Sequence, residues 1–150
     1  MTLPFVIRGV KADDIPFIFD GWMKQNRYAP ISKHVPTKIY RPYYHAVLED
    51  ILKRSTVIVA CNPDDETHTF GVLVWEPDPA LFHWLYVKDI YAGQGLARAL
   101  LTYAVPSLGT PQQPELICTS SGPTVFQNRS IVERYKLIYN PFLLFQGITP

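Results

Sequence analysis

The segment 85–101 changes its apolar pattern half-way, and no other feature of the sequence constrains the fold as strongly. Residues 81–87 are apolar and aromatic without a break, which is typical of a strand, and from Gly95 onward apolar residues recur at helical spacing. The change falls on the run Ala92-Gly93-Gln94-Gly95. A strand that passes through glycines into a helix leaves backbone N–H groups unpaired at the positive end of the helix dipole. This turn therefore predicts a site for a phosphate or another anion.

Apolar patterns on both sides of this turn predict the remaining elements. Strands are expected at residues 5–8, 56–61, 69–75, 81–87, 116–119, 138–139 and 142–145, the last two as a pair interrupted by Asn140-Pro141. Helices are expected from a cap at Asp13 or Asp14 to Trp22, and at residues 43–54, 95–104 and 125–137. The order is β-α-α-β-β-β-α-β-α-β. It predicts a mixed α/β (α+β) fold class in which helices flank a largely antiparallel central sheet.

Length and composition indicate one globular domain over residues 1–150, because 150 residues with 47% hydrophobic content can bury roughly two-thirds of the unfolded surface. The formal net charge of +1 gives no global field that favours nucleic acid or an anionic membrane. No apolar run is long enough to span a membrane and no signal peptide is recognisable, so a cytoplasmic protein is expected. Cys61 and Cys118 lie in separate apolar segments without metal-ligand spacing, which predicts reduced core thiols and no metal site.

Residues 25–41 lose the helical pattern and mix cations, aromatic rings and prolines, which predicts an irregular loop. Long loops in small domains are often functional. Two interpretations stay open: a loop that covers a binding site, or a solvated connector whose tyrosines pack on the core.

The chain resembles the GNAT superfamily of N-acetyltransferases, which transfer acetyl from acetyl-CoA to an amine. The resemblance covers the order of elements over the whole chain and rests on two motifs. The family's cofactor signature is Arg or Gln, two variable residues, Gly, a variable residue, and Gly or Ala, and the same frame here reads Ala92-Gly93-Gln94-Gly95-Leu96-Ala97. Many members carry an Asn and, seven residues later, a Tyr that reaches the thioester sulfur; Asn128 and Tyr135 keep that interval.

The resemblance implies acetyl-CoA as the cofactor. The main-chain groups of Leu85, Tyr86 and Val87 would pair with the pantetheine arm as an added strand does, and one of their N–H groups would hold the thioester oxygen. The turn from Gly93 to Ala97 would hold the pyrophosphate. Ala92 departs from the usual Arg or Gln, so Gln94 or Arg98 would have to supply the side-chain contact. Asn128 completes the cofactor set.

Acetyl transfer also needs an acid for the departing thiolate and a base for the amine. Tyr135 is the candidate acid, because a phenol stays protonated at neutral pH. His83 on the strand 81–87 is the candidate base, acting directly or through water, since imidazole titrates in the useful range. Glu76, at the end of the preceding strand, is the carboxylate alternative. The Glu that some relatives carry on this strand is absent.

The acceptor is expected to be a small-molecule or peptide amine. Cations between Arg27 and Arg41 would suit an acceptor that carries a carboxylate or phosphate beside its amine. Aromatic residues that could wall the acceptor side are Trp22, Tyr40, Tyr43, Tyr44 and Trp75. The apolar end 142–145 could pair across a homodimer. The competing interpretation is a non-catalytic GNAT-fold module that binds CoA or another protein; a nucleic-acid-binding domain ranks third because the charge is near neutral.

Overall fold

The computed structural model describes residues 3–27, 29, 32–77, 80–119 and 129–145, and in this part of the chain six strands form one sheet in sequence order. The strands are β1 (Val6–Gly9), β2 (Thr56–Asn62), β3 (Asp65–Pro77), β4 (Ala80–Val87), β5 (Leu116–Cys118) and β6 (Leu137–Tyr139). The pairs from β1 to β4 are antiparallel, whereas β4–β5 and β5–β6 are parallel. The prediction of a mixed, largely antiparallel sheet is confirmed.

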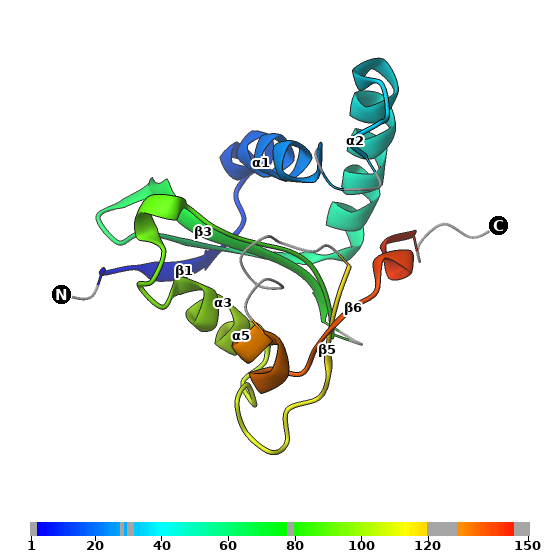
Figure 1. Cartoon of the computed structure of the whole chain (residues 1–150). Coiled ribbons are helices and arrows are strands. Elements are labelled where there is room, and N and C mark those ends of the chain that lie inside the picture. Colours follow the sequence, from blue (N-terminus) through cyan, green and yellow to red (C-terminus); the bar gives the residue numbers. More distant parts are fainter. Residues whose placement is uncertain (1–2, 28, 30–31, 78–79, 120–128, 146–150) are drawn as a thin grey trace.

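Helices cover both faces of this sheet, as Figure 1 shows. On one face lie α1 (Ile15–Arg27) and α2 (Thr37–Arg54), and on the other lie α3 (Leu96–Ala104) and α5 (Arg129–Arg134). Short 3-10 segments are η1 (Ala12–Asp14), η2 (Asp89–Tyr91) and η3 (Pro141–Phe145). None of the helices in the described ranges is long and apolar enough to cross a membrane.

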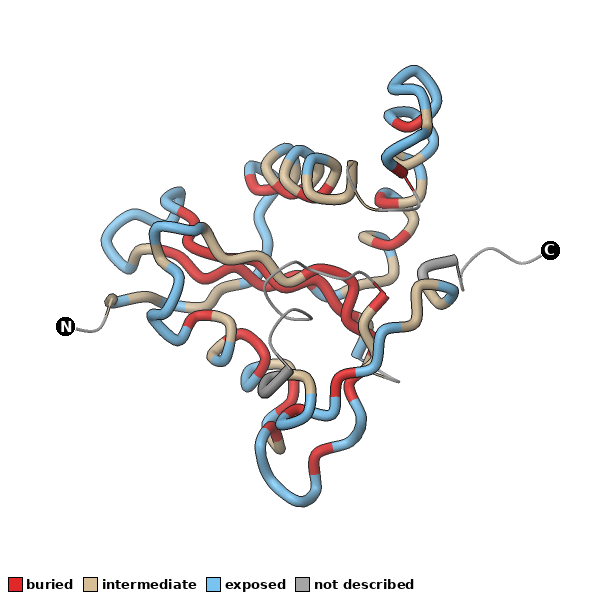
Figure 2. The backbone as a smooth tube through the Cα atoms, in the orientation of Figure 1, coloured by how far each residue is buried: buried red, intermediate tan, exposed pale blue. Residues whose placement is uncertain are grey.

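The core has two layers because successive residues of a strand point to opposite faces. Val57 and Val59 of β2 pack with Ile18 and Trp22 of α1, whereas Ile58 packs with the residues that α3 buries. The central strands are therefore buried on both faces, as Figure 2 shows, in agreement with the unbroken apolar runs of β2 and β3. Cys61 and Cys118 are free thiols, and burial raises the pKa of Cys118 to about 12.

Helix α2 begins at Thr37, so the prediction of an irregular chain up to Arg41 was wrong there. Pro36 lies just before the first turn, and its carbonyl accepts bonds from the N–H groups of Ile39 and Tyr40. Pro42 lies inside the helix, where it removes the bond to the Lys38 carbonyl. Lys38 and Pro42 are both exposed, so water can donate to the Lys38 carbonyl in place of the missing N–H.

Two further predictions at the carboxyl end were also wrong. The second strand of the expected final pair is the 3-10 helix Pro141–Phe145, because Pro141 has no N–H for a strand ladder. The last helix ends at Arg134 and not at residue 137, since Lys136 has a positive φ of 51° and Leu137 already belongs to β6. Phe142 is exposed, and pairing of this end across a homodimer stays a prediction.

Gly71 of β3 tests how tightly the centre of the sheet is built. A Cβ at this position would stand 2.8 Å from the main-chain oxygen of Tyr86 and 3.4 Å from Leu100. We expect Gly71→Ala to lower the free energy of unfolding by about 1–3 kcal/mol, as overpacking does in other cores. Denaturant unfolding measures this change. The control is Gly9→Ala in β1, where a Cβ meets nothing within 4 Å; equal stabilities of the two variants would contradict the prediction.

Candidate functional site

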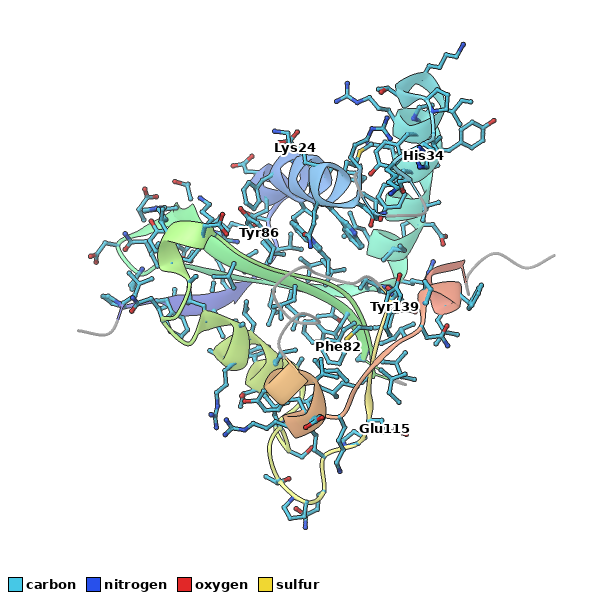
Figure 3. All side chains as sticks on the ribbon, in the orientation of Figure 1. Lys24, His34, Phe82, Tyr86, Glu115 and Tyr139 are labelled. Carbon is cyan, nitrogen blue, oxygen red and sulfur yellow. The ribbon has the colours of Figure 1, made fainter. Side chains whose placement is uncertain are left out.

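Strand β4 contains one residue more than its partner β3 at His83. Val74 pairs with Trp84 and Trp75 pairs with Phe82, so His83 has no Cα partner between them. This β-bulge turns the strand over, and Phe82 and Tyr86 consequently lie on opposite faces although both have even numbers (Figure 3). His83 itself is buried, with 1% of the residue exposed, and its ring contacts the polar side chains of Glu76 and Thr119.

The bulge coincides with the end of the pairing between β4 and β5. Leu81 and Phe82 pair with Ile117 and Cys118, and the N–H of Thr119 donates to the Phe82 carbonyl at 2.9 Å. In the part of the chain that the structure describes, β4 has no strand partner on this edge after Phe82. The two strands therefore separate at His83 and Thr119.

Main-chain groups of Leu85 and Val87 point to this open edge. The N–H of Lys88 donates to the Phe70 carbonyl at 3.0 Å, and bonding alternates along an antiparallel pair. The main-chain N–H and C=O groups of Tyr86 therefore face β3, and those of Leu85 and Val87 face the open edge. The Tyr86 side chain packs toward α1, stacked on Trp84 with ring centroids 5.3 Å apart.

The open edge leads directly into the glycine turn. Ala92 is extended, with φ −61° and ψ 146°, and Gly93 and Gly95 have φ values of 79° and 81°, a region that favours glycine. Helix α3 starts at Leu96 without a side-chain cap. The first-turn N–H groups of Leu96, Ala97 and Arg98 thus have no intrahelical acceptor. Residues 92–95 and Arg98 are exposed, whereas the Leu96 side chain is buried in the core, so Leu96 can offer a ligand only its main chain.

The two candidates for the base, His83 and Glu76, are in contact at the bulge, and His83 also contacts a third residue, Thr119. Its Nε2 lies 2.8 Å from Glu76 Oε2, and its Nδ1 lies 2.7 Å from Thr119 Oγ1. Glu76 also binds Arg54 Nε of α2 at 3.2 Å, and Arg54 pairs with Asp50 one turn earlier. A chain of polar groups thus runs from Thr119, just beyond β5, through β4 and β3 and ends on α2.

Burial determines the charge of His83. Desolvation lowers the pKa of His83 below its ordinary value, and the hydrogen bond and charge of Glu76 partly oppose this effect. The ring is consequently neutral at neutral pH. The Glu76 carboxylate, which Arg54 holds, accepts a hydrogen bond from Nε2–H, and this leaves Nδ1 as an acceptor for the Thr119 hydroxyl.

Comparisons of the sequence with family models and with curated proteins give no match. Solved structures do match. YycN from Bacillus subtilis, assigned as an acetyltransferase, has a TM-score of 0.62 at 13% identity, over 91% of this chain and 94% of that chain. A histone acetyltransferase HPA2-related protein from Corynebacterium glutamicum has a TM-score of 0.55 at 16% identity, over 87% and 84%. The ribosomal-protein-alanine N-acetyltransferase from Brucella melitensis has a TM-score of 0.52 at 14% identity, over 87% and 89%.

The chain has the GNAT fold. This confirms the fold expected from the glycine turn and the order of elements. The identities are low, so the likeness defines the architecture, and activity has to be argued from the residues.

Within the GNAT fold, Tyr135 lies one residue beyond the end of α5 and is 7% exposed. It packs in the apolar cluster on the α3 side, which also contains Phe82 and Leu116, and its carbonyl accepts a bond from Gln113 Nε2 at 2.6 Å. The structure thus surrounds the candidate acid largely with apolar side chains. Asn128, the other residue of that motif, lies outside the described residues.

Sequence reasoning missed Thr119 and Arg54. Thr119 was expected only as the end of a strand, and its contact with His83 joins residues 36 positions apart. Arg54 was expected only as the end of a helix, yet it contacts Glu76, 22 positions away. No local sequence signal marks either contact, because both depend on the order of strands in the sheet.

The aromatic residues expected around the acceptor do not form one wall. Trp22 is buried on the α1 side and stacks on Trp84, whereas Trp75 belongs to the cluster on the α3 face. Tyr40 is buried and its hydroxyl donates to the Met23 carbonyl at 2.7 Å. Tyr43 is 73% exposed.

The environment of His83 predicts its titration. Because its pKa is lowered in the folded protein, the ring should titrate below pH 6.5, and NMR of the His83 ring protons measures the midpoint. The unfolded chain binds a proton near pH 6.5 when the folded chain does not, so the free energy of unfolding should fall as pH decreases below 6.5 toward the folded pKa.

Two variants sharpen this prediction. Glu76→Gln removes the charge that opposes desolvation and should lower the midpoint further. Glu115→Gln, at an exposed position just before β5, should leave it unchanged. A midpoint at or above pH 6.5 in the unmodified protein would show that burial does not dominate the pKa of His83.

Proposed function

We propose that this protein is an acetyl-CoA-dependent N-acetyltransferase that transfers acetyl to a primary amine by direct attack of the amine on the thioester. One observation carries the proposal: among the described residues, the edge of β4 that lacks a strand partner starts at the His83 bulge and continues into a turn of exposed, left-handed glycines at the start of α3. A strand edge followed by an anion-binding turn matches a ligand that has an amide-containing arm and a pyrophosphate.

The residues of this edge and turn suit acetyl-CoA. The main-chain groups of Leu85 and Val87 would bind the pantetheine amides, and the N–H groups from Gly93 to Arg98 would bind the pyrophosphate. Gln94 and Arg98 are exposed beside the turn and would supply the side-chain contact that Ala92 lacks. When bound, acetyl-CoA supplies an activated acetyl group on a thioester.

The chain's own residues would then handle the protons. Tyr135 is the proposed acid for the departing thiolate, on the strength of its motif spacing. His83 is the proposed base, and Glu76 supports it as a partner and not as a competing base, since the two side chains are hydrogen bonded. With both ring nitrogens of His83 engaged, direct contact between this ring and the amine is disfavoured.

The glycine turn gives the first test of this function. Gly93→Ala and Gly95→Ala would place a methyl group where the anion binds and impose strain of about 1–2 kcal/mol at their positive φ. We expect acetyl-CoA to raise the melting temperature of the unmodified protein, and we expect each variant to weaken binding by roughly tenfold, about 1.4 kcal/mol. Isothermal titration and thermal shift measure these effects.

The matched control is Gly109→Ala. Gly109 has the same kind of φ, 79°, and a Cβ there also meets nothing within 4 Å, so it carries the backbone strain without touching the turn. If this variant loses affinity as the other two do, the turn is not the binding site. An unmodified protein without any response to acetyl-CoA favours the non-catalytic protein-interaction module.

The outer half of α2 and the residues before it offer cations for an acceptor. Figure 1 shows that this half of the helix projects beyond α1, and Lys33, His34, Lys38 and Arg41 are all exposed on it or just before it. Arg27, by contrast, donates to the Ser32 carbonyl at 2.8 Å and lies over the Tyr40 ring. Arg27 therefore braces the connection between the helices, and Lys38 and Arg41 are the better candidates for binding an anionic acceptor.

Acceptor recognition gives the second test. We expect Lys38→Ala combined with Arg41→Ala to raise the KM of an amine that carries a carboxylate by roughly tenfold, the value of two favourable exposed ion pairs. The KM of an uncharged amine should stay the same. Thiol release with an amine panel measures both. Lys24→Ala on α1, whose side chain is exposed and pairs with Asp20, is the control; equal KM values for the anionic amine in all three proteins would contradict this role.

A further inference from the structure

The His83 ring is held at both nitrogens and is shielded from solvent. Nε2 contacts Glu76 on β3, Nδ1 contacts Thr119 beyond β5, and the side chain is 0% exposed. A buried imidazole with both nitrogens engaged cannot itself take a proton from an amine in solution or in a binding site. Among the described contacts of His83, a proton exchanged with a ligand has to pass through Glu76 or Thr119.

The two partners face different surroundings. Glu76 is turned toward α2, where it also binds Arg54. Thr119 lies where β5 ends its pairing with β4: its N–H makes the last described bond to Phe82, at 2.9 Å, and the residue as a whole is 3% exposed. Of the two, Thr119 alone borders the edge along which β4 and β5 separate.

The chemistry of a hydroxyl suits this position. Threonine Oγ1 has one proton to donate and two lone pairs that accept. Since Nδ1 of the neutral ring is an acceptor, the Thr119 proton is directed to His83, and a lone pair of Oγ1 remains for a donor at the open edge. A protonated amine is such a donor.

We propose that Thr119 is the proton-accepting group that the acceptor amine contacts, and that His83 and Glu76 act behind it as a relay. The proposal rests on the acetyltransferase function proposed above. It adds Thr119 as the residue through which the base His83 receives the amine proton. Thr119 is the residue that contacts the amine in this scheme, His83 is the base that finally receives the proton through it, and Glu76 and Arg54 are positioning residues.

The step balances as two coupled proton transfers. The N–H bond of the ammonium group breaks and its proton passes to Thr119 Oγ1, while the Oγ1–H bond breaks and that proton passes to His83 Nδ1. The amine is left with a free electron pair, threonine is restored, and the positive charge moves to the imidazole ring beside the Glu76 carboxylate. No other bond is made or broken.

Arg54 and Asp50 fix the direction of the hydrogen bonds in the relay. Arg54 holds Glu76 from α2 and is itself paired with Asp50, so Glu76 is an acceptor toward His83. Among the described residues, the charged and titratable groups that face His83 are Glu76 from β3 and Arg54 from α2, and the Thr119 hydroxyl lies on the β5 side. A carboxylate behind the ring stabilises the imidazolium that the transfer produces.

The first experiment tests the hydrogen-bond chain without any substrate. ¹⁵N NMR of the His83 ring should show the neutral tautomer with its proton on Nε2 in the unmodified protein and in Thr119→Ser. In Thr119→Val the Nδ1 resonance should move, because its donor is lost. A ring protonated on Nδ1 in the unmodified protein would overturn the relay.

The second experiment compares two probe amines with different proton requirements. Tyramine is an ammonium ion at neutral pH and needs a base, whereas hydroxylamine is already neutral there. We expect Thr119→Val to lower kcat/KM for tyramine by about a hundredfold, the lower range for loss of general base catalysis, and to lower it only slightly for hydroxylamine. Raising the pH should recover the rate with tyramine. Thr119→Ser should retain most activity, which separates loss of the hydroxyl from a folding defect.

The controls separate the failure of this relay from the failure of the proposed function. Thr102→Val, at an exposed position on α3, should change neither rate. Binding of acetyl-CoA to Thr119→Val should equal that of the unmodified protein; if the unmodified protein does not bind acetyl-CoA, it is the proposed function that fails. Equal losses with both amines would show that Thr119 only clamps the strands, and no loss with either would show that it has no part in the reaction.

Discussion

The extra residue in β4 is the constraint on which the rest of the site depends. In a regular strand, alternate side chains would all belong to one apolar layer or the other. The bulge at His83 breaks this pattern and shifts the apolar side chains beyond it to the opposite faces. It also coincides with the end of the short strand β5, beyond which β4 has no strand partner on this edge among the described residues.

The bulge also has a local cost that the polar chain offsets. A buried imidazole without partners would be destabilising by several kcal/mol, and here Glu76 and Thr119 engage the two ring nitrogens from the neighbouring strands. The network joins His83 on β4 to Glu76 on β3, to Thr119 just beyond β5 and, through Glu76, to α2, so it holds the strands together where main-chain pairing ends. A polar group in this position can therefore stabilise the fold and take part in the proposed chemistry, and its loss would reduce both stability and activity.

How much the sequence predicts depends on how local each feature is. The strand, glycine turn and helix around Gly93 were predictable, because apolar periodicity and positive-φ glycines act within a few residues. Helix α2 starts earlier than predicted because Pro42 reads as a breaker in the sequence but lies at an exposed position where water replaces the lost bond. Thr119 and Arg54 were not predictable, since their contacts with His83 and Glu76 follow from the strand order and the bulge.

The same distinction explains why the donor side of the site is clearer than the acceptor side. Main-chain groups on the β4 edge and in the glycine turn depend on backbone conformation, so a departure such as Ala92 leaves most of the proposed binding groups in place. An acceptor is recognised by side chains, and those on α2, such as Lys38 and Arg41, are exposed and could pair with many anions. Thr119 belongs to neither group and lies one residue beyond β5, where β4 and β5 separate. If its hydroxyl receives the amine proton, the acceptor must bring its nitrogen to the point where β4 and β5 separate, whatever the remainder of that molecule is.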